Sequence, residues 1–363
     1  MDFLSFWLAL KHIPGLGNQT ALRLLHHFHS PAAILTAKEE ELKELGVREK
    51  TIFALKQEEW KRAVEEERKR LEKAGIEVIT YQDKCYPSLL KEIYDPPLLL
   101  YLKGNANLLN TPSLAIVGTR QATFYGIKTA TRLSMQLSEL GLTIVSGLAR
   151  GIDTAAHQGC LKAEGKTIGV LGCGLDIVYP KENAKLYAKI IEKGGAIVSE
   201  FPPGTPPLAH HFPARNRIIS GLSLGVLVVE AALKSGSLIT ARLALEQGRE
   251  VFAVPGPAGS PYSHGTHALI KQGAKLVETV TDILEELPIT FEKRNNEDKK
   301  ISPSLDPLTE KVLSFVQTPR HLDEIILNLG EDPSKILAKL TMLELQGLIE
   351  QLPGQQYVRV DRI

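Results

Sequence analysis

A series of short apolar runs between residues 114 and 277 constrains the fold of this chain more than any other feature. The runs are LAIV (114–117), TIVS (143–146), TIGVLG (167–172), AIVS (196–199), GVLVVE (225–230), EVFAV (250–254) and a final KLV. They are uniformly apolar rather than alternating, as expected of parallel strands covered by helices on both faces. The segments between them show helical spacing of apolar residues. We therefore predict an α/β fold with a doubly wound, Rossmann-like, mostly parallel sheet.

The sequence on either side of this sheet predicts two smaller domains. Residues 1–80 show helical periodicity and a tight glycine turn, which indicates a helical domain of the SAM-like or helix-hairpin-helix type. Residues 81–287 form the Rossmann-like domain, and the polar, proline-containing segment 288–304 is predicted to be a linker. Residues 305–363 contain three helical segments followed by two short β-like runs around Pro353 and Gly354. That order is typical of a winged helix.

The roles of these flanking domains stay open at this stage. The one clear hairpin, Pro14-Gly15-Leu16-Gly17, is expected either to present backbone amides to a DNA phosphate or to be an ordinary turn between helices. The third helix of the winged-helix-like domain offers Lys335 and Lys339 and little else for DNA contact. We therefore favour protein contact or a degenerate role over DNA binding for that domain.

Composition and cysteine usage limit the compartment and the cofactors. Cys85, Cys160 and Cys173 include no CxxC pair, which argues against a disulfide framework and a cysteine zinc site. The N-terminus has no signal-peptide pattern, and no stretch approaches the roughly 20 apolar residues that a membrane helix needs. We expect a cytoplasmic protein without a membrane segment or a metal. The net charge of +1 does not identify a partner, because the placement of the basic residues matters more.

Glycine, serine and basic residues gather where the predicted strands end. Ligands of open α/β sheets bind outside the carboxyl ends of the strands, and small residues there allow close approach to backbone amides. The loops in question are Gly118-Thr119-Arg120, Gly147 to Asp153, Gly172 to Gly174, Ser199-Glu200, Lys234-Ser235-Gly236-Ser237 and Pro255-Gly256. Arg215 and Arg217 are predicted to lie at the start of a helix near the same edge. Such an edge suits phosphate, unless its arginines pair with Asp153, Asp176, Glu200 and Glu230.

Several enzymatic sites fail at named positions. Ile177 replaces the third small residue of a dinucleotide fingerprint, and the triplet at Gly165 leads into a strand rather than a helix, unlike a P-loop. Ile144 stands where a nucleophile elbow needs glycine, and Asp153 is expected to cap a helix rather than act as a base. We therefore predict a binding protein without a cofactor rather than an enzyme. The alternative is a nucleotide-processing Rossmann-like hydrolase of the phosphoribohydrolase type.

The order and spacing of the strand-end motifs resemble those of the DprA/Smf family, the DNA processing protein A. The motifs are VGTR (117–120), SGLARGIDTAAH (146–157), SEFPPG (199–204), FPARNRIISGLS (212–223), KSGSLITA (234–241) and VFAVPG (251–256). The resemblance implies a cytosolic bacterial homodimer that binds and protects incoming single-stranded DNA. It also implies that the protein helps to load the RecA recombinase during natural transformation.

Together, the strand-end pattern and the resemblance predict a set of DNA-binding residues. These are Gly118, Arg120, Ser146, Gly147, Arg150, Gly151, Gly172, Arg215, Asn216, Arg217, Lys234, Ser235, Gly236, Ser237 and Thr240. Phe124, Tyr125 and Phe212 are expected either to stack on bases or to belong to the core. One departure from the family pattern is His267, which stands where asparagine is usual. The residues do not identify the dimer surface.

Overall fold

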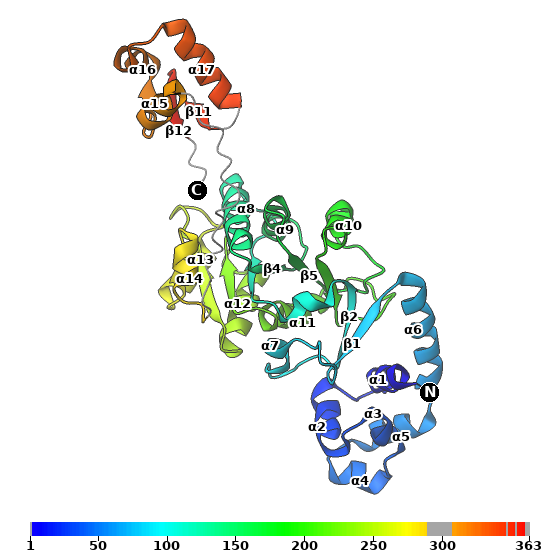
Figure 1. Ribbon diagram of the computed structural model, residues 1–363. Helices are drawn as coiled ribbons and strands as arrows, with labels where there is room; N and C mark the ends of the chain where they lie inside the picture. Colours follow the sequence, from blue (N-terminus) through cyan, green and yellow to red (C-terminus); the bar gives the residue numbers. More distant parts are fainter. Residues whose placement is uncertain (1, 289–306, 346–347, 353, 360–363) are drawn as a thin grey trace. The chain divides into compact units, whose positions relative to one another are not determined.

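The computed structural model describes residues 2–288, 307–345, 348–352 and 354–359. The chain divides into two compact units, Met1–Glu292 and Lys293–Ile363 (Figure 1). Almost all of the predicted linker, from residue 289 onward, lies outside the described residues. Among the described helices, none is both long and apolar enough to cross a membrane.

The first unit is built on a nine-stranded sheet with the order β1-β2-β6-β5-β4-β3-β7-β8-β9. The strands from β6 to β9 along this order run parallel, as the uniformly apolar runs predict. Strand and helix order place the topological switch point between β3 and β7, because the chain moves outward from β3 in both directions. The parallel strands are β3 Ser113–Val117, β4 Thr143–Ser146, β5 Thr167–Leu171, β6 Ala196–Ser199, β7 Gly225–Val228, β8 Glu250–Ala253 and β9 Lys275–Leu276.

Two strands at one end of the sheet differ from the sequence prediction. β1 (Glu77–Thr80) pairs antiparallel with β2 (Leu99–Gly104), and β2 pairs antiparallel with β6. The prediction that all of residues 1–80 are helical is therefore wrong for the last four, which belong to the sheet. Periodicity missed β1 because a four-residue strand directly after a helix is too short to show an alternating pattern.

Helices cover both faces of the sheet (Figure 1). One face packs on α8 (Phe124–Glu139), α9 (Ile152–Lys162) and α14 (Val280–Leu284), with Ile116 and Ile144 in the core between them. The other face packs on α11 (His211–Gly221), α12 (Gly236–Glu246) and α13 (His264–Lys271), through side chains such as Val145 and Val228. The remaining elements of this part are α7 Ser88–Lys91, η1 Ala106–Asn110, η2 Lys181–Asn183 and α10 Ala184–Glu192.

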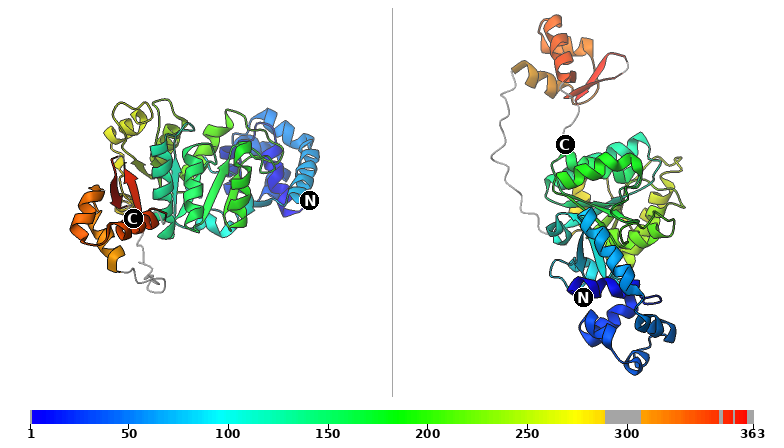
Figure 2. Two further views of the ribbon diagram at one scale, coloured as in Figure 1. Left: turned by 90° about the horizontal axis from the view of Figure 1, so that it is seen from above. Right: turned by 90° about the vertical axis from the view of Figure 1, so that its right-hand side faces the viewer.

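The N-terminal helices pack at the β1–β2 end of the sheet (Figure 2). They are α1 Phe3–His12, α2 Asn18–Phe28, α3 Pro31–Thr36, α4 Glu39–Glu44, α5 Glu49–Gln57 and α6 Trp60–Ala74. Trp7, Leu10 and Trp60 belong to the same hydrophobic cluster as Leu99 and Tyr101 of β2. Because of this shared core, the N-terminal helices and the sheet form one unit.

The second unit has the predicted winged-helix order. Its helices are α15 Pro307–Phe315, α16 Leu322–Leu329 and α17 Pro333–Leu345, and its strands are β10 Arg320–His321, β11 Ile349–Leu352 and β12 Gln356–Arg359. The strands form a separate antiparallel sheet in the order β10-β12-β11. Val312, Ile325, Ile336 and Ile349 form the centre of its core, so each helix contributes to one small apolar cluster.

Candidate functional site

A cleft of about 530 Å³ opens at the carboxyl ends of the strands, at the switch point between β3 and β7. We call it the switch-point cleft. A smaller inner pocket of about 60 Å³ adjoins it and shares Arg120, Ala149, Phe212 and Arg215. Of the residues predicted from the sequence, those that line one or both cavities are Gly118, Arg120, Gly147, Arg150, Gly172, Arg215, Asn216, Ser235, Gly236, Ser237 and Thr240.

The arginines around these cavities differ in their exposure. Arg120 is exposed, and its guanidinium carbon lies 5.0 Å from the centre of the Phe212 ring. Arg150 is also exposed and pairs with the exposed Glu182 on the rim. An exposed ion pair contributes little to stability, so Arg150 is available to a competing anion. Neither arginine is committed to a buried partner.

Arg215 is only 5% exposed, although it lines both cavities. Its Nη1 donates to the carbonyl oxygens of Gly147 and Val170, each at 2.5 Å, and thereby joins the ends of β4 and β5. Its Nε is buried and has no hydrogen-bond partner among the described residues. The sequence predicts Arg215 at the start of a helix, but α11 begins four residues earlier, at His211. Arg215 therefore lies beyond the first turn of α11.

Asp153 provides the negative charge nearest to Arg215. It lies in the first turn of α9, and the N-cap is Gly151, so the prediction that Asp153 is the N-cap is wrong. Its carboxylate instead accepts hydrogen bonds from the backbone amides of Gly147 (3.1 Å) and Ala149 (3.3 Å). Burial raises the pKa of Asp153, and Arg215 and these two amides only partly oppose that rise. Asp153 therefore orders the loop that follows β4.

Two glycines in this loop are required by close contacts. A Cβ at Gly147 would lie 2.3 Å from Nη1 of Arg215 and 2.7 Å from Oδ2 of Asp153. Gly151 has φ +75°, and a Cβ there would lie 2.4 Å from the carbonyl oxygen of Thr119. The glycine-rich sequence thus allows the loops after β3 and β4 to meet at the base of the cleft.

Aromatic side chains form part of the wall. Phe212 lines both cavities, and Tyr179 lines the inner pocket with its ring centre 5.7 Å from that of Phe212. Tyr179 is not predicted from the sequence, because it lies in the long connection after β5 and no motif marks it. Phe124 is 81% exposed and Tyr125 46% exposed, so both belong to the surface rather than the core.

Four predicted site residues do not line either cavity. Ser146 is fully buried and donates to the carbonyl oxygen of Ile116 at 2.6 Å, so it joins β4 to β3. Gly151 acts through its backbone conformation, and Lys234 is exposed in the loop before α12. Arg217 lies in a different cluster, where its guanidinium pairs with Glu200 at 2.7 Å and Asp95 at 3.3 Å. The structure therefore does not bring Arg217 together with the other predicted residues.

Burial makes two potentially catalytic groups, Cys173 and His157, less reactive. Cys173 lines the inner pocket, but burial raises the pKa of its thiol to about 11. Burial lowers the pKa of His157 to about 3, so this imidazole is neutral at physiological pH. Among the described residues, no group of histidine, cysteine and carboxylate side chains could hold a metal ion. His267, which replaces the usual asparagine, contacts the carbonyl oxygen of Gly256 at 3.0 Å and so supports the turn after β8.

Comparison with known proteins assigns all three parts of the chain. The profile of the family described as DNA recombination-mediator protein A matches residues 77–288, and a DprA winged helix domain matches residues 297–355. A SAM-like helix-hairpin-helix tandem matches residues 8–60. Only one hairpin is clear in the sequence. The turn between α4 and α5 in the same range has a single glycine, Gly46, so a second hairpin there is hard to recognise.

Similar proteins agree with this assignment. Protein Smf of Escherichia coli is 40% identical over 369 residues, which cover 99% of this chain and 96% of that protein. DNA processing protein DprA of Bacillus subtilis is 52% identical over 215 residues, covering 59% of this chain and 72% of its own. The crystal structure of DprA from Streptococcus pneumoniae superposes with a TM-score of 0.71 at 40% identity, covering 80% of this chain and 100% of that one.

A second solved structure adds a ligand class for a relative. DNA processing protein A of Helicobacter pylori superposes with a TM-score of 0.52 at 33% identity, over 58% of this chain and 94% of that one, and its structure describes a single-stranded DNA binding mode. The family profile spans the whole nine-stranded sheet, and the Smf relative spans nearly the whole chain. The chain therefore belongs to the DNA processing protein A family.

Proposed function

We propose that this protein binds single-stranded DNA in the switch-point cleft and the inner pocket. The observation that carries the proposal is the convergence of Arg120, Arg150 and Arg215 around Phe212, where the loops after β3 and β4 meet α11. Cations along a groove follow a phosphate backbone, and an aromatic ring at the same place stacks on a base of any sequence. The single-stranded DNA binding described for the Helicobacter pylori relative supports the same ligand class.

The salt dependence of binding tests this proposal. We propose that four cations contact phosphates: Arg120, Arg150 and Arg215, which line the cavities, and Lys234 on the exposed loop before α12. At about −0.7 per phosphate contact, the affinity for an oligothymidine should fall with salt at a log-log slope of about −3. Fluorescence anisotropy titrations over a range of salt concentrations measure this slope. A slope near zero, or equal affinity for duplex DNA, would contradict the proposal.

Base stacking on Phe212 makes a separate prediction. Phe212→Leu keeps the apolar volume but removes the aromatic face, so we expect about a fivefold loss of affinity for oligothymidine, the lower end of one stacked base. The salt slope should stay unchanged, because no phosphate contact is lost. Phe124→Leu is the matched control, since Phe124 is exposed but lines neither cavity. Equal losses for the two variants would show that Phe212 has no special role.

The nucleotide-processing alternative is tested by incubating the protein with AMP and measuring free adenine. We expect none, because the thiol of Cys173 is protonated at neutral pH and His157 is buried away from both cavities. Turnover that Arg120→Glu abolishes would establish a hydrolase in place of a binding protein.

RecA is the proposed protein partner, and the family resemblance is its support. We propose that the protein acts in the cytoplasm as a homodimer that delivers RecA to protected single strands during transformation and recombination. Sedimentation of the purified protein measures its oligomeric state. Assembly of RecA on oligothymidine, with and without this protein, measures its effect on loading.

A further inference from the structure

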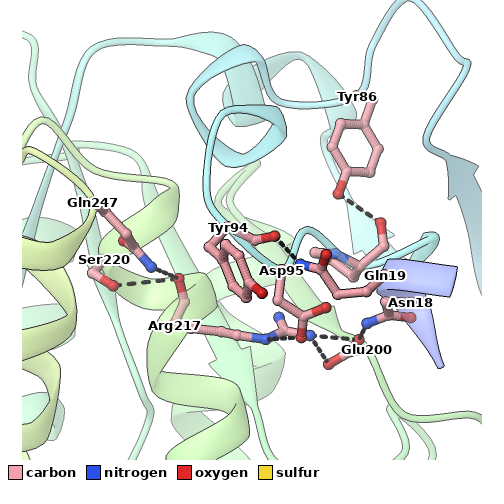
Figure 3. A network of polar contacts seen from close by, with 10 residues as sticks. Asn18, Gln19, Tyr86, Tyr94, Asp95, Glu200, Arg217, Ser220 and Gln247 are labelled. Atoms are coloured by element: carbon pink, nitrogen blue, oxygen red, sulfur yellow. Dashed lines mark hydrogen bonds and ion pairs between the residues drawn. The ribbon is translucent and has the colours of Figure 1, made fainter. Parts of the chain in front are cut away.

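A buried polar cluster joins the N-terminal helices to the strand-end side of the sheet (Figure 3). At its centre is Glu200, directly after β6, whose carboxylate accepts from Nη2 of Arg217 at 2.7 Å and from Nδ2 of Asn18 at 2.8 Å. Nζ of Lys11 donates to the carbonyl oxygen of Glu200. Asn18 is the first residue of α2, so the hairpin that the sequence analysis considered for DNA contact here directs this side chain to a carboxylate of the protein itself.

Charge balance in this cluster keeps Glu200 ionised. Burial alone would raise the pKa of Glu200, but the charges of Arg217 and Lys11 and the hydrogen bond from Asn18 outweigh it and lower the pKa. Nε of Arg217 also lies 3.3 Å from Asp95, which precedes β2. The guanidinium of Arg217 therefore holds the loop after β6 and the segment before β2, and Asn18 of α2 reaches the same carboxylate of Glu200.

The same helix that provides Arg217 also forms a wall of the switch-point cleft. Phe212, Arg215 and Asn216 of α11 line the cleft. Successive residues of an α-helix are rotated by about 100°, so Arg217 points about 200° away from Arg215, to the opposite side of α11. The carbonyl oxygen of Arg217 accepts from Nε2 of Gln247, directly after α12, and α12 lines the cleft as well. A displacement of Arg217 would thus move two walls of the cleft.

We propose that the N-terminal helices hold α11 in the orientation that single-stranded DNA binding needs, with Asn18, Glu200 and Arg217 as positioning residues. The inference rests on the proposed function and adds a role for the hairpin domain, which then acts on DNA binding without touching DNA. It differs from the sequence-based expectation that Arg217 contacts phosphate directly. The two roles predict different salt dependences.

The test uses the full chain, a labelled oligothymidine and the variants Asn18→Ala, Arg217→Met and Arg217→Lys. We expect Asn18→Ala and Arg217→Met to weaken binding by about twofold to thirtyfold, the range for residues that act on a site through packed neighbours. Arg217→Lys should recover part of the loss, because it keeps a charge beside Glu200. Hydrogen exchange in the peptide 211–221 should become faster in Asn18→Ala.

Gln82→Ala is the matched control. Its Nε2 donates to the carbonyl oxygen of His29, 3.0 Å away, so it also joins the N-terminal helices to the sheet but does not reach α11. We expect unchanged DNA binding and unchanged exchange in 211–221 for this variant. Thermal melting checks that each variant folds. If Arg217→Met does not fold, Asn18→Ala alone tests the positioning role, because Asn18 is partly exposed at a helix start and its loss should be tolerated.

The salt titration separates the possible failures. A positioning role leaves the log-log slope of each variant at the wild-type value, whereas loss of a direct phosphate contact reduces it by about 0.7. A reduced slope for Arg217→Met, or wild-type affinity for both Asn18→Ala and Arg217→Met, overturns the inference and leaves the proposed function intact. Absence of oligothymidine binding by the wild-type protein overturns both.

Discussion

Arg120→Glu is expected to weaken binding to oligothymidine by at least about thirtyfold. Arg120 is exposed, lines both cavities and lies against Phe212, and it has no ion pair among the described residues. A charge-assisted hydrogen bond is worth roughly 1.5 to 3 kcal/mol, and the reversed charge adds repulsion from the phosphate. Because the side chain is exposed, the free energy of unfolding should change by less than about 0.5 kcal/mol.

Arg62→Glu is the control for this variant. Arg62 is an exposed arginine on α6 that pairs, within the described part of the chain, with Glu66 alone, and the substitution changes the net charge by the same amount. It should leave the affinity within about twofold of the wild type, since a distant exposed charge is screened by salt. If both variants bind equally weakly, binding depends on net charge and the cleft is not the site.

Arg215→Met is expected to destabilise the fold strongly as well as weaken DNA binding. The substitution removes the donor to the carbonyl oxygens of Gly147 and Val170 and the cation nearest to the buried Asp153. Removal of one partner from a buried charged arrangement costs about 3 to 5 kcal/mol. Urea unfolding of the first unit should show this loss, whereas Arg120→Met should unfold like the wild type.

Arg215→Met should destabilise the fold more at high pH than at low pH. Burial raises the pKa of Asp153 above its ordinary value, and Arg215 opposes that rise, so the pKa should rise further in the variant. When folding raises the pKa of a carboxyl group, the free energy of unfolding falls as the pH rises above the group's pKa in the unfolded chain, which is about 4. The difference in the free energy of unfolding between variant and wild type should therefore be larger at pH 8 than at pH 5. The opposite trend would show that Asp153 does not lose a cationic partner.

The sequence by itself determined the parts of this protein that depend on local patterns. Uniformly apolar runs identified the parallel strands to within about two residues of their observed ends, and the strand-end glycines located the edge where the cleft lies. The motifs identified the family, and the proline-containing polar segment separated the winged helix. These features are encoded by neighbouring residues, since strand and helix periodicities and turn residues act over a few positions.

Only the tertiary structure decided which side chains share a site. Arg215 and Arg217 are two residues apart in one motif, yet one lines the cleft and the other pairs with Glu200 beside the N-terminal helices. Tyr179 reaches the inner pocket from a long connection, and β1 joins the sheet through a partner strand about twenty residues away in the sequence. Helical spacing sets the angle between side chains around one axis. The direction of that axis, and so which side chain meets which partner, is set by packing against residues distant in the sequence.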